Sequence, residues 1–180
     1  MTSLPAPSTL PHASDEELTH VLDLLFEPSP PLRTITLPVL RSATFPSYDV
    51  LITAVNAQLN ALAISSDPAH LNTLSEILCA HPRLGEKKVD SEQSRKEQAQ
   101  LNTGGEAEAE KLAALNREYE EVFPGLRYVV FVNGRARPEV MHNMRERIDR
   151  ADVRAERADA IQAMCDIARD RAAKLQNVDA

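Results

Sequence analysis

The chain has 180 residues, a formal net charge of −7, 43% hydrophobic residues and 26% charged residues, which is typical of one soluble globular domain. The negative charge argues against binding to a nucleic-acid backbone or to an anionic membrane surface. The five glycines form no G-x-G-x-x-G or G-K-[ST] motif, and no G-x-S-x-G motif of a serine hydrolase occurs. So few glycines favour a helical fold over an all-β fold with many tight turns.

The ends of the sequence and its apolar runs predict a cytoplasmic protein. The first residues, MTSLPAPSTLPHAS, lack the basic and apolar regions of a secretory signal, and the last residues, QNVDA, are not a peroxisomal address. No apolar run is long enough to span a membrane. Two cysteines, Cys79 and Cys165, are too few for a disulfide framework and are expected to be reduced.

The first half of the chain predicts helices separated by proline-rich breaks. Residues 1–13 are expected to be a disordered leader because prolines recur there. Ser14 opens the first helix with a capping box, and the prolines in 27–31 end it. We expect 35–43 to be irregular, and a second helix to begin after Ser47.

Further helices are predicted in the rest of the chain. Asp67-Pro68 marks the start of a helix that ends at His81-Pro82. Residues 83–91 read as a loop, and 128–132 (YVVFV) form either a short strand or a buried extended segment. Apolar residues at helical spacing, separated by Gly104-Gly105 and other breaks, predict the remaining helices at about 91–101, 106–122, 138–150 and 152–176. The sum is an all-α fold, a single compact domain of about seven or eight helices that covers residues 14–177.

His81 is the histidine with the most distinctive position. It is expected to lie at a helix C-terminus, where backbone carbonyls favour the protonated imidazole, so that it could donate a proton near neutral pH. A histidine that merely caps the helix is the alternative. None of the five histidines has the spacing of a metal site, so no metal is predicted.

A polar helical face and one arginine are the other candidate site features. Ser94, Glu97 and Gln98 share one face of a helical turn and offer a hydroxyl, a carboxylate and an amide to a small polar ligand. A solvated surface helix is the alternative for this face. Arg171 lies within the apolar stripe of the last helix and needs either a carboxylate partner or an anionic ligand. Both interpretations of Arg171 are open on the sequence.

Several blocks of the sequence, in order, resemble the OHCU decarboxylase family. The similarity covers about residues 15–176 and gains its specificity from the order of the blocks. The blocks are Leu25-Phe26-Glu27-Pro28-Ser29-Pro30, Phe45-Pro46-Ser47, His81-Pro82-Arg83-Leu84-Gly85, Ser94-x-x-Glu97-Gln98, Leu115-Asn116-x-x-Tyr119 with Phe123, Tyr128-Val129-Val130-Phe131-Val132-Asn133-Gly134-Arg135, and Ile167-x-x-x-Arg171-x-x-x-Leu175.

The resemblance implies a cofactor-independent carboxy-lyase that converts 2-oxo-4-hydroxy-4-carboxy-5-ureidoimidazoline to (S)-allantoin in urate degradation. It implies an all-α homodimer without metal or organic cofactor, with His81 as proton donor and Glu97 as its carboxylate partner. It also implies a group of substrate-binding residues: Pro82, Ser94, Arg95, Lys96, Glu97, Gln98, Val129, Val130, Phe131, Val132, Asn133 and Arg171. Some members of the family are peroxisomal, and the peroxisome is therefore a second expected location.

Two other functions are compatible with the sequence. One is a catalytically silent helical module that binds a ligand, although the presence of His81, Glu97 and Arg171 together argues against it. The other is a lyase that acts on a different small heterocyclic acid.

Overall fold

A computed structural model describes residues 3–86, 92–99 and 105–176, and these residues form helices and no β-strand. The predicted all-α fold is confirmed. Within the described residues, no helix is both long enough and apolar enough to cross a bilayer. The elements in chain order are the 3-10 helix η1 (Pro7–His12) and the α-helices α1 (Asp15–Phe26), α2 (Pro30–Ser42), α3 (Tyr48–Ala63), α4 (Pro68–Leu78), α5 (Glu92–Ala99), α6 (Glu106–Val122), α7 (Arg137–Arg150) and α8 (Val153–Gln176).

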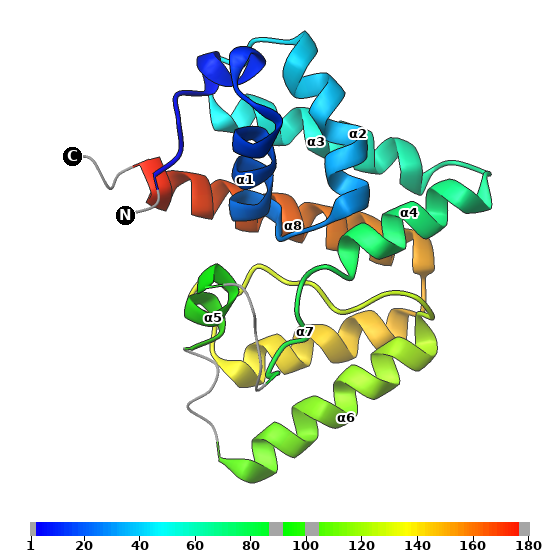
Figure 1. Ribbon diagram of the computed structural model, residues 1–180. Helices are drawn as coiled ribbons and strands as arrows, with labels where there is room; N and C mark the ends of the chain where they lie inside the picture. Colours follow the sequence, from blue (N-terminus) through cyan, green and yellow to red (C-terminus); the bar gives the residue numbers. More distant parts are fainter. Residues whose placement is uncertain (1–2, 87–91, 100–104, 177–180) are drawn as a thin grey trace.

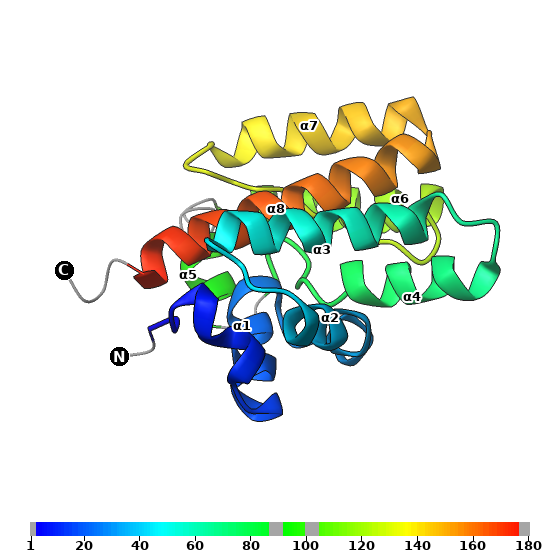
Figure 2. The same cartoon turned by 90° about the horizontal axis from the view of Figure 1, so that it is seen from above.

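The last helix, α8, lies in the middle of the fold. In Figure 1 it runs between α1–α4 on one side and α5–α7 on the other. Figure 2 shows α3 and α8 alongside each other, and α8 also packs on α1 and α4. The core is mostly aliphatic, with the buried rings of Tyr48, Tyr119, Phe26 and Phe123 among its largest side chains.

Local capping signals set the start of several helices as predicted. The Ser14 hydroxyl accepts a hydrogen bond from the Glu17 amide while the Glu17 side chain accepts one from the Ser14 amide, which completes a capping box. Ser47 accepts from the amide of Val50 at the start of α3, and Asp67 caps α4. These three N-termini are confirmed.

The prediction of an irregular segment at 35–43 is wrong, because these residues belong mostly to α2. Ser29 caps this helix and Pro30 lies in its first turn, where a proline removes no needed N–H donor. Buried side chains at Leu32, Thr36 and Leu40 recur every four residues and hold one face of α2 in the core. This packing outweighs the cost of Pro38 inside the helix.

The disordered leader predicted at 1–13 is also wrong for the residues that the structure describes. Residues 7–12 form η1, the Leu10 side chain is fully buried, and Leu4 is close to fully buried. The Tyr48 hydroxyl donates a hydrogen bond of 2.8 Å to the carbonyl of Pro5. Burial of two leucines offsets the entropy lost on ordering this proline-rich segment.

The structure also describes two other segments for which the sequence made a prediction. The YVVFV run at 128–132 is an extended segment with no partner strand in the described part of the chain. The helix predicted at about 91–101 corresponds to α5, although residues 91, 100 and 101 lie outside the described ranges. The same is true of 87–90 in the predicted loop and of Gly104.

Candidate functional site

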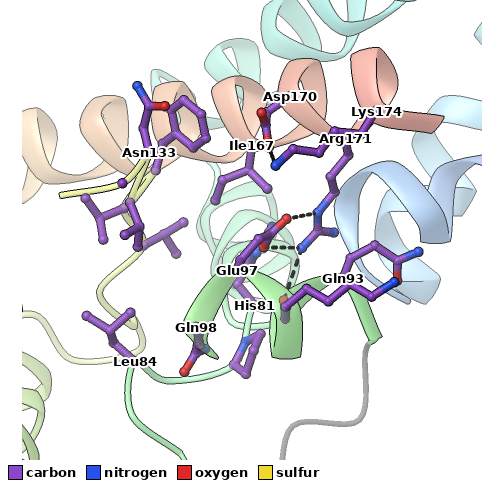
Figure 3. Close-up of a pocket in the computed structure, with 18 of the residues that line it drawn as sticks. His81, Leu84, Gln93, Glu97, Gln98, Asn133, Ile167, Asp170, Arg171 and Lys174 are labelled. Carbon is purple, nitrogen blue, oxygen red and sulfur yellow. Dashed lines mark hydrogen bonds and ion pairs between the residues drawn. The ribbon is translucent and has the colours of Figure 1, made fainter. Parts of the chain in front are cut away.

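A cavity of about 740 Å³ lies between the segment after α4, helix α5, the extended segment 128–132 and α8. Figure 3 shows side chains from these elements around it. Every site residue that the sequence predicts lines this cavity except Arg95, which is exposed. The predicted residues in its wall are His81, Pro82, Ser94, Lys96, Glu97, Gln98, Val129, Val130, Phe131, Val132, Asn133 and Arg171.

The inner face of α5 is turned into the protein rather than into solvent. Ser94 and Gln98 are the buried residues of this helix, so the alternative of a solvated surface helix is wrong for this face. The Gln98 amide donates to the carbonyl of Arg83 at 3.3 Å and accepts from the amide of Gly85 at 2.9 Å. These contacts fix α5 against the segment that follows His81.

Arg171 forms the centre of a buried ion-pair cluster. Its Nε and Nη2 atoms donate to the two carboxylate oxygens of Glu97 at 2.7 and 2.8 Å, and Figure 3 shows this pair beside the cavity. Nη2 also donates to Glu27 at 2.7 Å and to the Ser94 hydroxyl at 3.1 Å. Burial lowers the pKa of Arg171, but the bonds to Glu97 and Glu27 outweigh this and raise it.

Of the two interpretations of Arg171, the structure therefore shows the ion pair with carboxylates. The side chain is only 2% exposed, and a guanidinium in such surroundings needs negative partners to offset its desolvation. Arg171 still lines the cavity, but its nitrogen atoms already have protein acceptors.

Glu27 belongs to this cluster, and the sequence analysis gave it no role. It follows the last residue of α1, it is 3% exposed, and its carboxylate accepts from Ser94 at 2.6 Å as well as from Arg171. Its position in the Phe26-Glu27-Pro28 block was the one signal in the sequence that could have identified it. From the sequence alone, that block predicts only a helix break and contributes to the family resemblance.

His81 lines the cavity in a different state from the one expected. Helix α4 ends at Leu78, so the imidazole lies beyond the last helical turn and gains little from its carbonyls. Burial, aided by the nearby positive charge of Arg171 and opposed by Glu27, lowers the pKa of His81 to about 4. The expectation of a protonated imidazole near neutral pH is therefore wrong for the free protein. The buried Nε2 atom of this neutral ring has no hydrogen-bond partner among the residues that the structure describes.

The low pKa of His81 predicts a pH-dependent stability. In the unfolded chain a histidine takes up its proton below about pH 6.5, whereas in the folded protein it does so only near the lowered value. Stability from the neutral ring is complete above the unfolded pKa and is lost as the pH falls toward the folded one. Between about pH 7.5 and about pH 5 we expect this to cost about 2 kcal/mol.

Urea unfolding of the wild-type protein and of His81→Gln at both pH values measures this contribution. The difference between the two proteins in free energy of unfolding should shift by that amount against the wild type at the lower pH. A difference that does not change with pH contradicts a buried neutral His81.

The extended segment and Asn133 form one wall of the cavity, and several of their backbone carbonyls are bound by arginines. Arg147 donates to the carbonyl of Val129 at 3.0 Å, and Arg135 donates to those of Phe131 and Val132. By contrast, no backbone N–H from Val129 to Asn133 donates to an acceptor within the described ranges. Any of these N–H groups that faces the cavity could donate to the carbonyl or carboxylate oxygens of a ligand.

A metal centre has no candidate in the part of the chain that the structure covers. No three side chains among its histidines, cysteines, aspartates and glutamates lie close enough to hold an ion. The absence of a metal and of an organic cofactor stays a prediction of the sequence.

Comparison with known proteins gives the family of this chain. A search of curated proteins found no match. The family model described as OHCU decarboxylase matches residues 11–173, which is most of the chain and includes every residue of the cavity wall named above. The chain therefore belongs to the OHCU decarboxylase family, a family of carboxy-lyases in urate degradation.

Proposed function

We propose that this protein converts 2-oxo-4-hydroxy-4-carboxy-5-ureidoimidazoline to (S)-allantoin and CO₂. The observation that carries the proposal is one cavity lined together by the imidazole of His81, the carboxylate of Glu97 and the segment 129–133, whose backbone N–H groups donate to no acceptor in the described ranges. A small heterocycle rich in carbonyl groups could accept from those N–H groups that face the cavity. Membership of the family supports the same reaction class.

The chemistry of the substrate explains why side chains alone could catalyse this reaction. The carboxylate and the hydroxyl are on the same ring carbon, next to a ring C=N bond. When the bond to CO₂ breaks, its electron pair forms a carbon–carbon double bond, and the C=N nitrogen takes up electrons and a proton. The hydroxyl then loses its proton to become the carbonyl of allantoin, and the neighbouring carbon gains one. The net reaction consumes one proton and needs no external electron acceptor.

In this proposal the neutral His81 handles the proton of the hydroxyl. The imidazole is neutral in the free protein, so one of its ring nitrogens is a base that accepts this proton and then, as the imidazolium, returns it to one face of the substrate ring. Delivery to one face accounts for a single enantiomer of the product. The role differs from that of a preprotonated donor, because His81 becomes charged only during the reaction.

Glu97 has the second role, at the same end of the cavity. Its side chain is 23% exposed, in contrast to the buried Glu27, so it can reach a bound ligand while Arg171 holds it. A carboxylate there stabilises the imidazolium as it forms. This effect is larger in the transition state than with bound substrate, because the imidazolium forms only as the proton moves.

The direct test is turnover by the purified protein. Freshly generated substrate should lose its ultraviolet absorbance faster with protein than without it, and circular dichroism should show one enantiomer of allantoin. Binding without turnover would favour the catalytically silent module. Turnover of a related heterocyclic acid, but not of this substrate, would favour a different lyase.

Glu97→Gln is expected to lower kcat by more than it raises KM. The amide keeps the size of the side chain but lacks the negative charge that stabilises the imidazolium as it forms. Steady-state kinetics check this, with Glu92→Gln as the matched control on the exposed face of the same helix. A change confined to KM in Glu97→Gln would make Glu97 a binding residue only.

The homodimer and the cytoplasmic location stay predictions from the sequence. Light scattering of the purified protein checks the first, and localisation of a tagged chain in its own cells checks the second.

A further inference from the structure

Glu27 has a backbone conformation that is unusual for a residue with a side chain. Its φ is 73° and its ψ is 154°, in a region that is populated almost only by glycine. The residue after it is Pro28, which further restricts the backbone at this position. Strain of this kind persists where the surroundings enforce it, and it occurs most often at functional sites.

The strained backbone places the Glu27 carboxylate between two elements that are far apart in the sequence. It accepts from Ser94 on α5 at 2.6 Å and from Arg171 on α8 at 2.7 Å. Arg171 in turn donates to Ser94 at 3.1 Å, so the three side chains form a closed triangle. All three are buried.

The triangle positions the part of α5 that faces the cavity. The buried residues of α5 are polar, Ser94 and Gln98, so hydrogen bonds rather than apolar packing hold this helix in place. Glu97 lies on the same face as Ser94, one turn further along, and is bound at both of its oxygens by Arg171. A shift of Arg171 or Ser94 therefore moves Glu97 relative to the cavity.

We propose that Glu27 is a positioning residue of this site, which acts through Arg171 and Ser94 to hold Glu97 where a ligand meets it. The kinetic test of this inference rests on the function proposed above, because it measures turnover. Glu27 does not line the cavity, which is consistent with action through its neighbours rather than on the substrate.

A double-mutant cycle tests the link from Glu27 to Glu97. Glu27→Gln should lower kcat/KM on the order of 10²-fold, because small displacements of a catalytic group have effects of that size. If Glu27 acts through Glu97, the double variant with Glu97→Gln should lose little more activity than Glu97→Gln alone. Losses that multiply in the double variant would overturn the proposal.

Hydrogen exchange gives a readout that does not depend on turnover. In Glu27→Gln the amides of α5 should exchange faster, while those of α3 should keep their protection. The matched control is Asp23→Asn, which removes another carboxylate of α1, the one that pairs with Arg33. This variant should leave the exchange of α5 and the kinetics unchanged. Unchanged exchange in α5 of Glu27→Gln contradicts the role of Glu27, whereas a wild-type protein without turnover contradicts the proposed function.

Glu27→Gly keeps the proposal testable if Glu27→Gln does not fold. Glycine relieves the backbone strain, so its melting temperature should be at or above that of Glu27→Ala, which retains the strained Cβ. It should nevertheless lose activity and loosen α5, because it lacks the carboxylate. A stable Glu27→Gly with wild-type kcat/KM and wild-type exchange in α5 would overturn the assignment.

Discussion

His81→Ala should lower kcat by about 10²–10⁴-fold, which is the usual contribution of a general acid–base group. The imidazole lines the cavity, and its buried Nε2 has no hydrogen-bond partner in the described part of the chain. Alanine at this position removes the only proposed carrier of the hydroxyl proton. Substrate binding should change much less, because Glu97 and the segment 129–133 still line the cavity.

The control for this variant is His142→Ala, which removes an exposed histidine that pairs with Glu146 on α7. It should have wild-type kinetics. Stopped-flow measurement of the loss of substrate absorbance separates binding from chemistry in both variants. A His81→Ala protein that folds and has a kcat near that of the wild type would contradict the role of His81.

Much of the fold could be predicted because its helices begin at strong local signals. The capping box at Ser14 and the caps at Ser47 and Asp67 require only a few neighbouring residues to form. The errors arose where local signals compete with packing. The segment 35–43, predicted to be irregular, belongs mostly to α2, because the burial of Leu32 and Leu40 outweighs the prolines in this helix.

The site was predicted less completely because its chemistry depends on contacts across the chain. The family blocks placed His81, Glu97 and Arg171 in one site, and the cavity contains all three. Glu27 was missed because its partners, Ser94 and Arg171, are 67 and 144 residues away in the sequence.

The protonation state of His81 was predicted wrongly for a related reason. The proximity of a helix end could be read from the sequence, but the burial of the ring and the approach of Arg171 could not. Loss of hydration lowers the pKa of His81 by more than the carbonyls at the end of α4 could raise it, because the ring is enclosed by protein.

Arg171→Met should destabilise the fold by about 3–5 kcal/mol, the usual cost of removing one partner from a buried ion pair. The Arg171 side chain is 2% exposed and forms ion pairs with both Glu27 and Glu97. Its loss therefore leaves Glu27 as an uncompensated charge in the core. Arg169→Met is the control on the same helix. It breaks a more exposed pair with Asp49 and should cost less than about 1 kcal/mol.

Chemical denaturation of two further variants tests whether the stranded carboxylate is the cause of this loss. Adding Glu27→Gln to Arg171→Met removes the stranded charge and should restore part of the lost stability. Arg171→Lys should be intermediate, because an ammonium keeps the charge but cannot bind both oxygens of Glu97 as the planar guanidinium does. Activity should fall in all of these variants because Glu97 loses its anchor. If Arg171→Met instead unfolds at the wild-type denaturant concentration and loses only substrate affinity, Arg171 is a direct ligand of the substrate, and the buried cluster contributes little to the fold.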